Sequence, residues 1–363
     1  MDLSFSPSPP EAPRYDSGLK AWILSRYADV HAALREPTFC QVSARGPSTG
    51  PVDPIALSQM HAELQADIDR MSTELWRERM VNIAHTLMNQ AADRMSVNIV
   101  DHVIQPWSTA VMLSLSGADH ALEARLSSIA DLLFHKREND ETSLIEKEPR
   151  PAFVKKWFKW RRENAEADLD RMRGSGQITI SKSMFFGVSQ TLPSFLAKAW
   201  LALLLHPDQL EMLRTEPHWM PYAVEELLRY AGIVHTLYRQ ATKDVVLGDA
   251  HIAKDERIIL KLESANRDPI KFDSPGRLDI TRRPTGNLGL GVGPYACAGG
   301  VIVRKALSLV TPAFLAAHPI LDEGAPILWT GDTSIRRPLA VSVRFWKQSV
   351  EVRDHPHIGK LGL

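Results

Sequence analysis

The sequence predicts a mainly α-helical protein with small β-sheets. Apolar residues recur at spacings of three and four through much of the first half, as in Trp76, Met80, Ile83 and Leu87, which is the period of an amphipathic helix. After Arg239 the pattern changes to short runs of β-branched residues separated by turn residues, which favours strands. With 363 residues, of which 44% are hydrophobic and 24% charged, the chain is long enough to enclose a deep ligand cavity.

We expect one folding unit over residues 19–350, preceded by a flexible lead at 1–18 and followed by a tail at 351–363. Gly174 and Gly176 interrupt the helical pattern, and His206-Pro207 ends a long apolar helix. The expected order is a strand at 21–25, a helix from residue 27, a loop at 41–56, mostly helix at 57–162, the apolar helix at 178–205, a helix at 221–230, short strands after 239, a loop at 273–293, a helix after 297 and strands at 338–346.

Charge and hydropathy exclude several classes of protein. Lys and Arg number 43, as do Asp and Glu, so the chain lacks the basic excess of a nucleic-acid-binding protein. The longest apolar run, around 201–205, is far shorter than the ~20 residues needed to span a membrane. The polar, Pro-rich start does not resemble a signal peptide. We therefore expect a soluble, cytoplasmic protein that binds neither nucleic acid nor membrane.

Cys297 is the first candidate functional residue. The chain has two cysteines, too few for a disulfide framework or a multi-cysteine zinc site. Cys297 lies in the glycine-rich segment 286–300, just before a helical pattern begins, and a helix N-terminus lowers a thiol pKa and favours the metal-binding thiolate. A plain glycine turn and a phosphate loop are the alternatives, although neither G-x-G-x-x-G nor G-K-[ST] is present.

This segment resembles the haem-binding signature of the cytochrome P450 family, F-x-x-G-x-x-x-C-x-G. Gly293, Cys297 and Gly299 match that signature, and Leu290 replaces its aromatic residue. Upstream, AVEELLRY contains the family's E-x-x-R pattern, with its glutamate at position 226 and its arginine at 229, and the segments that follow keep the family's order. The resemblance is strong from Phe185 to Trp346 and weaker before that.

The resemblance implies the cytochrome P450 fold with one haem b, whose axial ligand is the thiolate of Cys297. It implies that Arg239 contacts a haem propionate. It also implies that Glu226, Arg229 and Arg277 form a structural network that holds the loop of Cys297.

Two positions of the implied haem site depart from the family pattern. Tyr295 stands where the family has His or Arg, and a phenol can hydrogen-bond a propionate but cannot neutralise it. The early H-x-x-x-R pattern appears as His61 with Gln65, so one basic contact is lost. We expect Arg239 and His61 to hold the propionates, with an ordinary surface histidine as the alternative for His61.

The long apolar helix departs from the family at its proton-relaying acid. The family's acid-alcohol pair, which relays protons and steadies dioxygen, falls on Gln190 and Thr191, and Gln190 cannot act as a general acid. A core amide with a backbone partner is the alternative for Gln190. Pro193 is expected to kink this helix. The basic, aromatic segment 157–162 (WFKWRR) is expected to form an amphipathic lid helix, with a partner or dimer contact as the alternative.

The resemblance predicts a monooxygenase that hydroxylates or demethylates a small organic molecule, using O2 and electrons from a separate ferredoxin or flavodoxin. Gln190 leaves open a haem-thiolate enzyme of another class, driven by peroxide or catalysing coupling or isomerisation. The weakened propionate contacts leave open a non-catalytic binding module. The substrate is not readable from the sequence, although His235 is a polar candidate for the pocket, with a solvated turn residue as the alternative.

Overall fold

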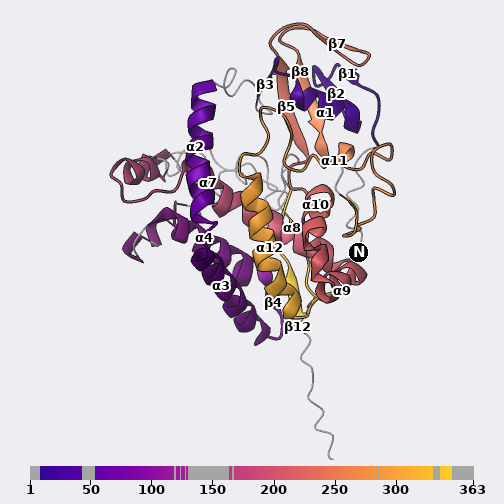
Figure 1. The fold of residues 1–363 in the computed structure, drawn as a ribbon. Coiled ribbons are helices and arrows are strands. Elements are labelled where there is room, and N and C mark those ends of the chain that lie inside the picture. Colours follow the sequence, from indigo (N-terminus) through magenta and orange to yellow (C-terminus); the bar gives the residue numbers. More distant parts are fainter. Residues whose placement is uncertain are drawn as a thin grey trace, which may run out of the picture.

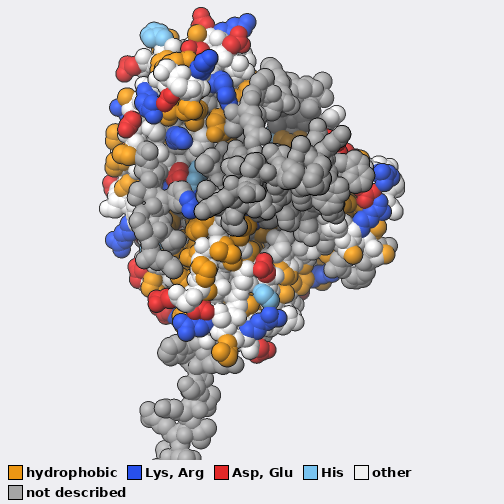
Figure 2. All heavy atoms as spheres, turned by 180° about the vertical axis from the view of Figure 1, so that it is seen from behind, with side chains coloured by type: hydrophobic (Ala, Val, Ile, Leu, Met, Phe, Trp, Pro, Cys, Tyr) orange, Lys and Arg blue, Asp and Glu red, His pale blue; other side chains and the backbone are white. Residues whose placement is uncertain are grey.

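The computed structural model describes residues 9–42, 54–117, 120–122, 124–126, 128–129, 163–165, 167–283, 286–329 and 336–345. Figure 1 shows a helical part and, beside the N-terminal helix α1 (Tyr27–Arg35), a part built of strands. Side chains of both signs are interspersed on the face shown in Figure 2. The mainly helical prediction, with small sheets, is confirmed.

The principal sheet joins strands from distant parts of the chain. Its order is β1-β2-β8-β5-β3, in which β2 and β8 are parallel and the other neighbours antiparallel. The first strand lies inside the segment that we expected to be a flexible lead. The strands are β1 (Arg14–Asp16), β2 (Ala21–Leu24), β3 (Phe39–Gln41), β5 (Thr236–Ala241) and β8 (Arg257–Lys261), with the hairpin β6 (Val245–Leu247) and β7 (Ala250–Ile252) nearby.

The helices form most of the remaining described structure. Thr73 caps α3 through its hydroxyl, which accepts from the backbone N–H of Trp76. No single described helix is long and apolar enough to cross a membrane, although the pair Met184–Leu204 and Pro207–Thr215, bent by 101°, meets that test together. The helices are α2 (Pro54–Arg70), α3 (Glu74–Ala92), α4 (Gln105–Ser116), α9 (Pro207–Thr215), α10 (Met220–Tyr230), α11 (Leu262–Ala265) and α12 (Gly300–Ala316).

The long apolar helix predicted at 178–205 is divided. It consists of α7 (Lys182–Phe186), the π-helical turn η3 (Gly187–Thr191) and α8 (Leu192–Leu204). Pro193 has no N–H to continue the α-helical ladder, so a carbonyl one turn earlier loses its partner. A kink was expected at Pro193, and the distortion that the structure contains is a π turn that ends two residues before it.

The described residues contain two hydrophobic clusters. The larger cluster lies among the helices and includes the stacked rings of Trp200 and Phe314, with centroids 4.3 Å apart. The smaller cluster lies between α1 and the principal sheet and includes Leu24 and Phe39. The remaining small sheets are β4 (Val97–Asn98) with β12 (Ser342–Phe345) and β9 (Pro319–Leu321), and β10 (Leu328–Trp329) with β11 (Pro338–Ala340).

Candidate functional site

The loop that carries Cys297 is fixed by its own backbone. The N–H of Cys297 donates to the carbonyl of Leu290 at 2.8 Å, and the N–H of Gly300 donates to the carbonyl of Cys297 at 3.1 Å. Gly299 precedes the first residue of α12, so Cys297 lies immediately before a helix, as predicted. The side chain of Cys297 is accessible, whereas Cys40 is buried in β3. The loop therefore presents one thiol from a fixed backbone.

Two glycines of this loop lie where a side chain would collide with neighbouring backbone. A Cβ on Gly289 would overlap the carbonyl oxygen of Leu228 in α10. Gly293 has φ of +78°, and a Cβ there would overlap the carbonyl oxygen of Leu34 in α1. The loop thus packs directly against a helix from each part of the fold, and glycine permits both approaches.

The pKa of the Cys297 thiol is raised above its ordinary value, chiefly because the surrounding protein partly desolvates this otherwise accessible group. The N–H of Gly299 and the charge of Arg304 act in the opposite direction. The net shift in the pKa of this thiol is therefore upward, opposite to the direction expected from its place before a helix, because desolvation outweighs these two contributions.

Arg239 and Tyr295, two predicted contacts, lie together. Arg239 is 2% exposed, and its guanidinium carbon lies 5.0 Å from the centroid of the Tyr295 ring. Its Nη1 donates to the carbonyl of Tyr238 at 2.9 Å, and no acidic side chain among the described residues pairs with it. Burial lowers the pKa of Arg239, although the group stays a cation. The result is a buried positive charge beside the Cys297 loop.

The predicted pair Glu226 and Arg229 is present and buried. Arg229 Nε and Nη2 donate to the two carboxylate oxygens of Glu226 at 2.8 and 2.7 Å, and both side chains are 1% exposed. The third charge is Arg282, whose Nε lies 3.2 Å from Glu226 Oε2. Arg277, which we expected in that role, is exposed, and only its backbone carbonyl accepts from Arg229, at 3.1 Å. The assignment of Arg277 is corrected to Arg282.

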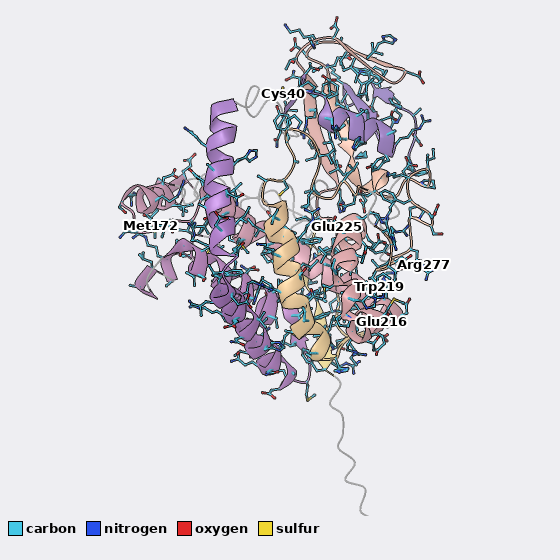
Figure 3. The ribbon with its side chains drawn as sticks, viewed as in Figure 1. Cys40, Met172, Glu216, Trp219, Glu225 and Arg277 are labelled. Atoms are coloured by element: carbon cyan, nitrogen blue, oxygen red, sulfur yellow. The ribbon has the colours of Figure 1, made fainter. Side chains whose placement is uncertain are left out.

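A second charged group, which sequence reasoning missed, holds the same loop. Glu225 Oε2 accepts from Asn287 Nδ2 at 2.9 Å and from Arg304 Nη2 at 3.2 Å, and Arg304 Nε also donates to Oε1. Figure 3 shows Glu225 beside α12 and Arg277 at the opposite edge of this region. The two consecutive glutamates, Glu225 and Glu226, could have indicated two separate charged contacts, because successive residues of a helix face different neighbours. Glu225 connects α10 to both ends of the segment 287–304.

The pair Gln190 and Thr191 closes the π turn η3. Gln190 is 7% exposed, and its Nε2 has no hydrogen-bond partner in the described structure. Its carbonyl accepts from Ser194 Oγ at 2.5 Å. Thr191 is half-buried at the start of α8. The alternative interpretation of Gln190 was a core amide hydrogen-bonded to the backbone. Its side-chain nitrogen makes no such bond in the described structure.

His61 lies on α2 and is exposed, as is Gln65, which instead donates to Asp69 Oδ1 at 2.9 Å. No described contact joins His61 to the Cys297 loop. The expected lid segment 157–162 and the tail 351–363 lie outside the described residues.

A comparison with protein-family models matches residues 183–318 to the family described as Cytochrome P450. The chain belongs to the cytochrome P450 family. It is accordingly an oxidoreductase of the P450 monooxygenase class, and members of this family hold haem through a cysteine thiolate.

Curated relatives extend this likeness over most of the chain. Cytochrome P450-SU2 of Streptomyces griseolus is 26% identical, covering 88% of this chain and 86% of its own length. Beta-dihydromenaquinone-9 omega-hydroxylase of Mycobacterium tuberculosis is also 26% identical, covering 90% and 72%. The solved structure of P450BioI, in complex with acyl carrier protein ligated to hexadec-9Z-enoic acid, shares the fold with a TM-score of 0.74 at 20% identity, covering 93% and 95%.

Proposed function

We propose that this P450 binds haem b through the Cys297 thiolate and hydroxylates or demethylates a small organic molecule, using O2 and electrons from a separate ferredoxin or flavodoxin. The observation that carries the proposal is the accessible Cys297 thiol, held by its own backbone in a loop whose Tyr295 lies against the buried Arg239. A cytoplasmic location is part of the same proposal.

The residues around Cys297 fit that cofactor. Haem b carries two anionic propionates, and Arg239 is a buried cation without an acidic partner among the described residues. Burying such a charge is costly unless an anion compensates it. The ring of Tyr295 lies against Arg239, and its phenolic O–H can donate a hydrogen bond to the same anion. We propose Cys297, Arg239 and Tyr295 as haem-binding residues, with His61 as a further propionate contact whose exposure on α2 gives it less support.

When bound, haem supplies the activation of dioxygen, and the thiolate ligand favours O–O cleavage. The side chains of η3 would hold protons near that chemistry. Thr191 can donate its hydroxyl proton and accept another in return, whereas the amide of Gln190 can donate a hydrogen bond but cannot release a proton at neutral pH. Proton delivery would then depend on Thr191 with water, or on the substrate.

The ligand assignment is tested by the reduced carbon monoxide spectrum. The wild-type protein should show the thiolate-dependent band near the wavelength in the family's name, and Cys297→Ser should abolish it. Cys40→Ser should keep it, because Cys40 is buried in β3 with its sulfur 3.5 Å from the carbonyl of Gln240. Loss of the band in Cys40→Ser alone would show that the ligand is misassigned.

One observation favours a second candidate function, oxidation driven by hydrogen peroxide. The buried, unpartnered amide of Gln190 occupies the position of the family's acid, and general acid-base help is typically worth ~100-fold or more in rate. Peroxide already brings both protons, so a missing acid would matter less.

The two functions differ in the effect of Thr191→Ala. For an O2-dependent monooxygenase, the variant should divert electrons to hydrogen peroxide, and Gln190→Glu should keep or raise the product formed per NADH. For a peroxide-driven enzyme, Thr191→Ala should change little and no redox partner should be needed. Both are measured once a substrate is found by spectral screening. Unchanged coupling in both variants would remove η3 from the mechanism while leaving the haem assignment intact.

A further inference from the structure

A second cluster of titratable groups lies on α8, away from Gln190 and Thr191. Lys198 Nζ donates to the carbonyl of Gly232 at 2.9 Å and lies 2.8 Å from His235 Nε2. His235 Nδ1 lies 3.1 Å from Glu263 Oε2, and Glu263 Oε1 lies 3.6 Å from Arg267 Nη1. The cluster therefore joins α8, the segment before β5 and α11 through a chain of polar contacts.

The contacts assign the protons in this cluster. His235 Nδ1 faces a carboxylate, so it carries the hydrogen, and Nε2 accepts from the ammonium of Lys198. Burial and the charge of Lys198 lower the pKa of His235 to about 3, so the ring is neutral. A neutral ring thus separates Lys198 from Glu263, the nearest carboxylate in this chain of contacts.

Lys198 is consequently a half-buried cation, and the neutral ring of His235 lies between it and the carboxylate of Glu263. Two of its three N–H groups are engaged, and no acidic side chain among the described residues forms an ion pair with it. Burial lowers the pKa of Lys198 to about 8, Glu263 acts in the opposite direction, and the cations Arg267 and Arg336 lower it further. Among the described groups that act on the pKa of Lys198, two cations therefore stand against one carboxylate, and an added anion would be favoured there.

The position of Lys198 relates it to the proposed active site. Thr191, Ser194 and Lys198 are spaced by three and four residues, which places them on one face of α8 with Lys198 about 10 Å beyond Thr191. Gly232, whose carbonyl Lys198 holds, also packs against the Cys297 loop, since a Cβ at Gly232 would lie 3.8 Å from Gly289 Cα. The ammonium of Lys198 therefore lies on the face of the helix that carries Thr191. It also contacts the segment at Gly232, which packs against the Cys297 loop.

We propose that Lys198, oriented by His235 and Glu263, recognises a carboxylate group of the substrate, which would accept the third N–H of the ammonium. This assignment of a substrate class rests on the proposed function, because it places the substrate along α8. The competing role is purely structural, in which Lys198 only fastens α8 to Gly232.

Binding of matched acids and alcohols distinguishes the two roles. The haem-loaded wild-type protein is titrated with octanoate, dodecanoate and phenylacetate, and with the corresponding primary alcohols, by isothermal calorimetry and by the shift of the Soret band. At least one acid should bind about 10-fold or more tightly than its alcohol, the usual worth of a charge-assisted hydrogen bond. Lys198→Met should remove that preference, whereas Lys182→Met, at a partly exposed lysine of α7 whose ammonium pairs with Asp170, should keep it.

The pH dependence provides a readout that a structural role would not change. Acid affinity should fall as pH rises through about 8, because Lys198 loses its proton, while alcohol affinity stays constant. The charged groups that face Lys198 are Glu263, Arg267 and Arg336, and His235, whose pKa is lowered to about 3, stays neutral across that range.

Three results would overturn the assignment: no acid of the panel binds, acids and alcohols bind equally to the wild type, or the acid preference survives in Lys198→Met. If Lys198→Met does not fold, Lys198→Gln keeps a donor for Gly232 without the charge, and the same outcomes apply. Calorimetry measures the acid preference whether or not the carbon monoxide band appears, so failure of the haem assignment is seen separately.

Discussion

At the scale of single residues, the loop of Cys297 depends on buried charges with specific partners. The E-x-x-R spacing predicted that Glu226 and Arg229 meet, because residues three apart on a helix are neighbours. It could not select Arg282 over Arg277, since both lie in an irregular loop where no period tells which side chain turns inward. Similarly, the sequence indicated Arg239 and Tyr295 as separate contacts but gave no sign that they stack.

We expect Arg229→Met to destabilise the protein by about 3–5 kcal/mol, because it leaves the carboxylate of Glu226 buried with a weakened partner. Arg277→Ala is the control. It removes an exposed side chain and keeps the carbonyl that accepts from Arg229, so its effect should be within about 0.5 kcal/mol. Urea unfolding of both variants measures the two values. Equal losses would return Arg277 to the network in place of Arg282.

At the scale of elements, the glycines of the loop decide how closely it approaches its neighbours. The glycine-rich composition predicted a close approach, but the contacts of Gly289 with α10 and of Gly293 with α1 are non-local and leave no mark on the local sequence. The same holds for η3. Pro193 predicted a distorted helix, yet the π turn depends on how the freed carbonyls are met by surrounding structure.

Gly289→Ala should lower both stability and haem content. Its Cβ would overlap the carbonyl of Leu228, so the loop must move away from α10, at a cost of about 1–3 kcal/mol or more. Gly276→Ala is the matched control, because nothing lies within 4 Å of its added Cβ and its φ is not positive. Haem absorbance per protein and thermal unfolding provide the comparison. Full haem content and unchanged stability in Gly289→Ala would mean that the close approach is not required.

At the scale of the whole molecule, the Cys297 loop joins the two hydrophobic clusters. Leu288 is buried in the cluster beneath the principal sheet, and Leu290, two residues on, packs against the helical cluster. The sequence predicted both kinds of structure but not their assembly, because the parallel pairing of β2 with β8 joins residues more than 200 positions apart, as in Ala21 with Arg257. Local sequence patterns do not determine which residues of two such distant strands pair.

This arrangement predicts that haem strengthens the connection between the two clusters. A ligand that binds only the folded protein stabilises it by about 4 kcal/mol when present at 1,000 times its Kd. Because Cys297 follows Leu288 and Leu290 in one hydrogen-bonded loop, that stabilisation should reach both clusters. Amide hydrogen exchange of the haem-loaded and haem-depleted protein should therefore differ most at 286–300. The next largest differences should lie in α12 and in β5, the strand that carries the proposed propionate contact Arg239.

The matched control is Cys297→Ser supplied with the same haem. It replaces one sulfur atom of the loop by oxygen and keeps the packing but lacks the thiolate, so its exchange at 286–300 should remain close to that of the haem-depleted protein. The edge strand β1, whose residues belong to neither cluster, should exchange alike in all three samples. Uniform protection of the whole chain by haem would instead indicate one cooperative unit without a separate junction. Equal exchange at 286–300 with and without haem would contradict the placement of the cofactor at this loop.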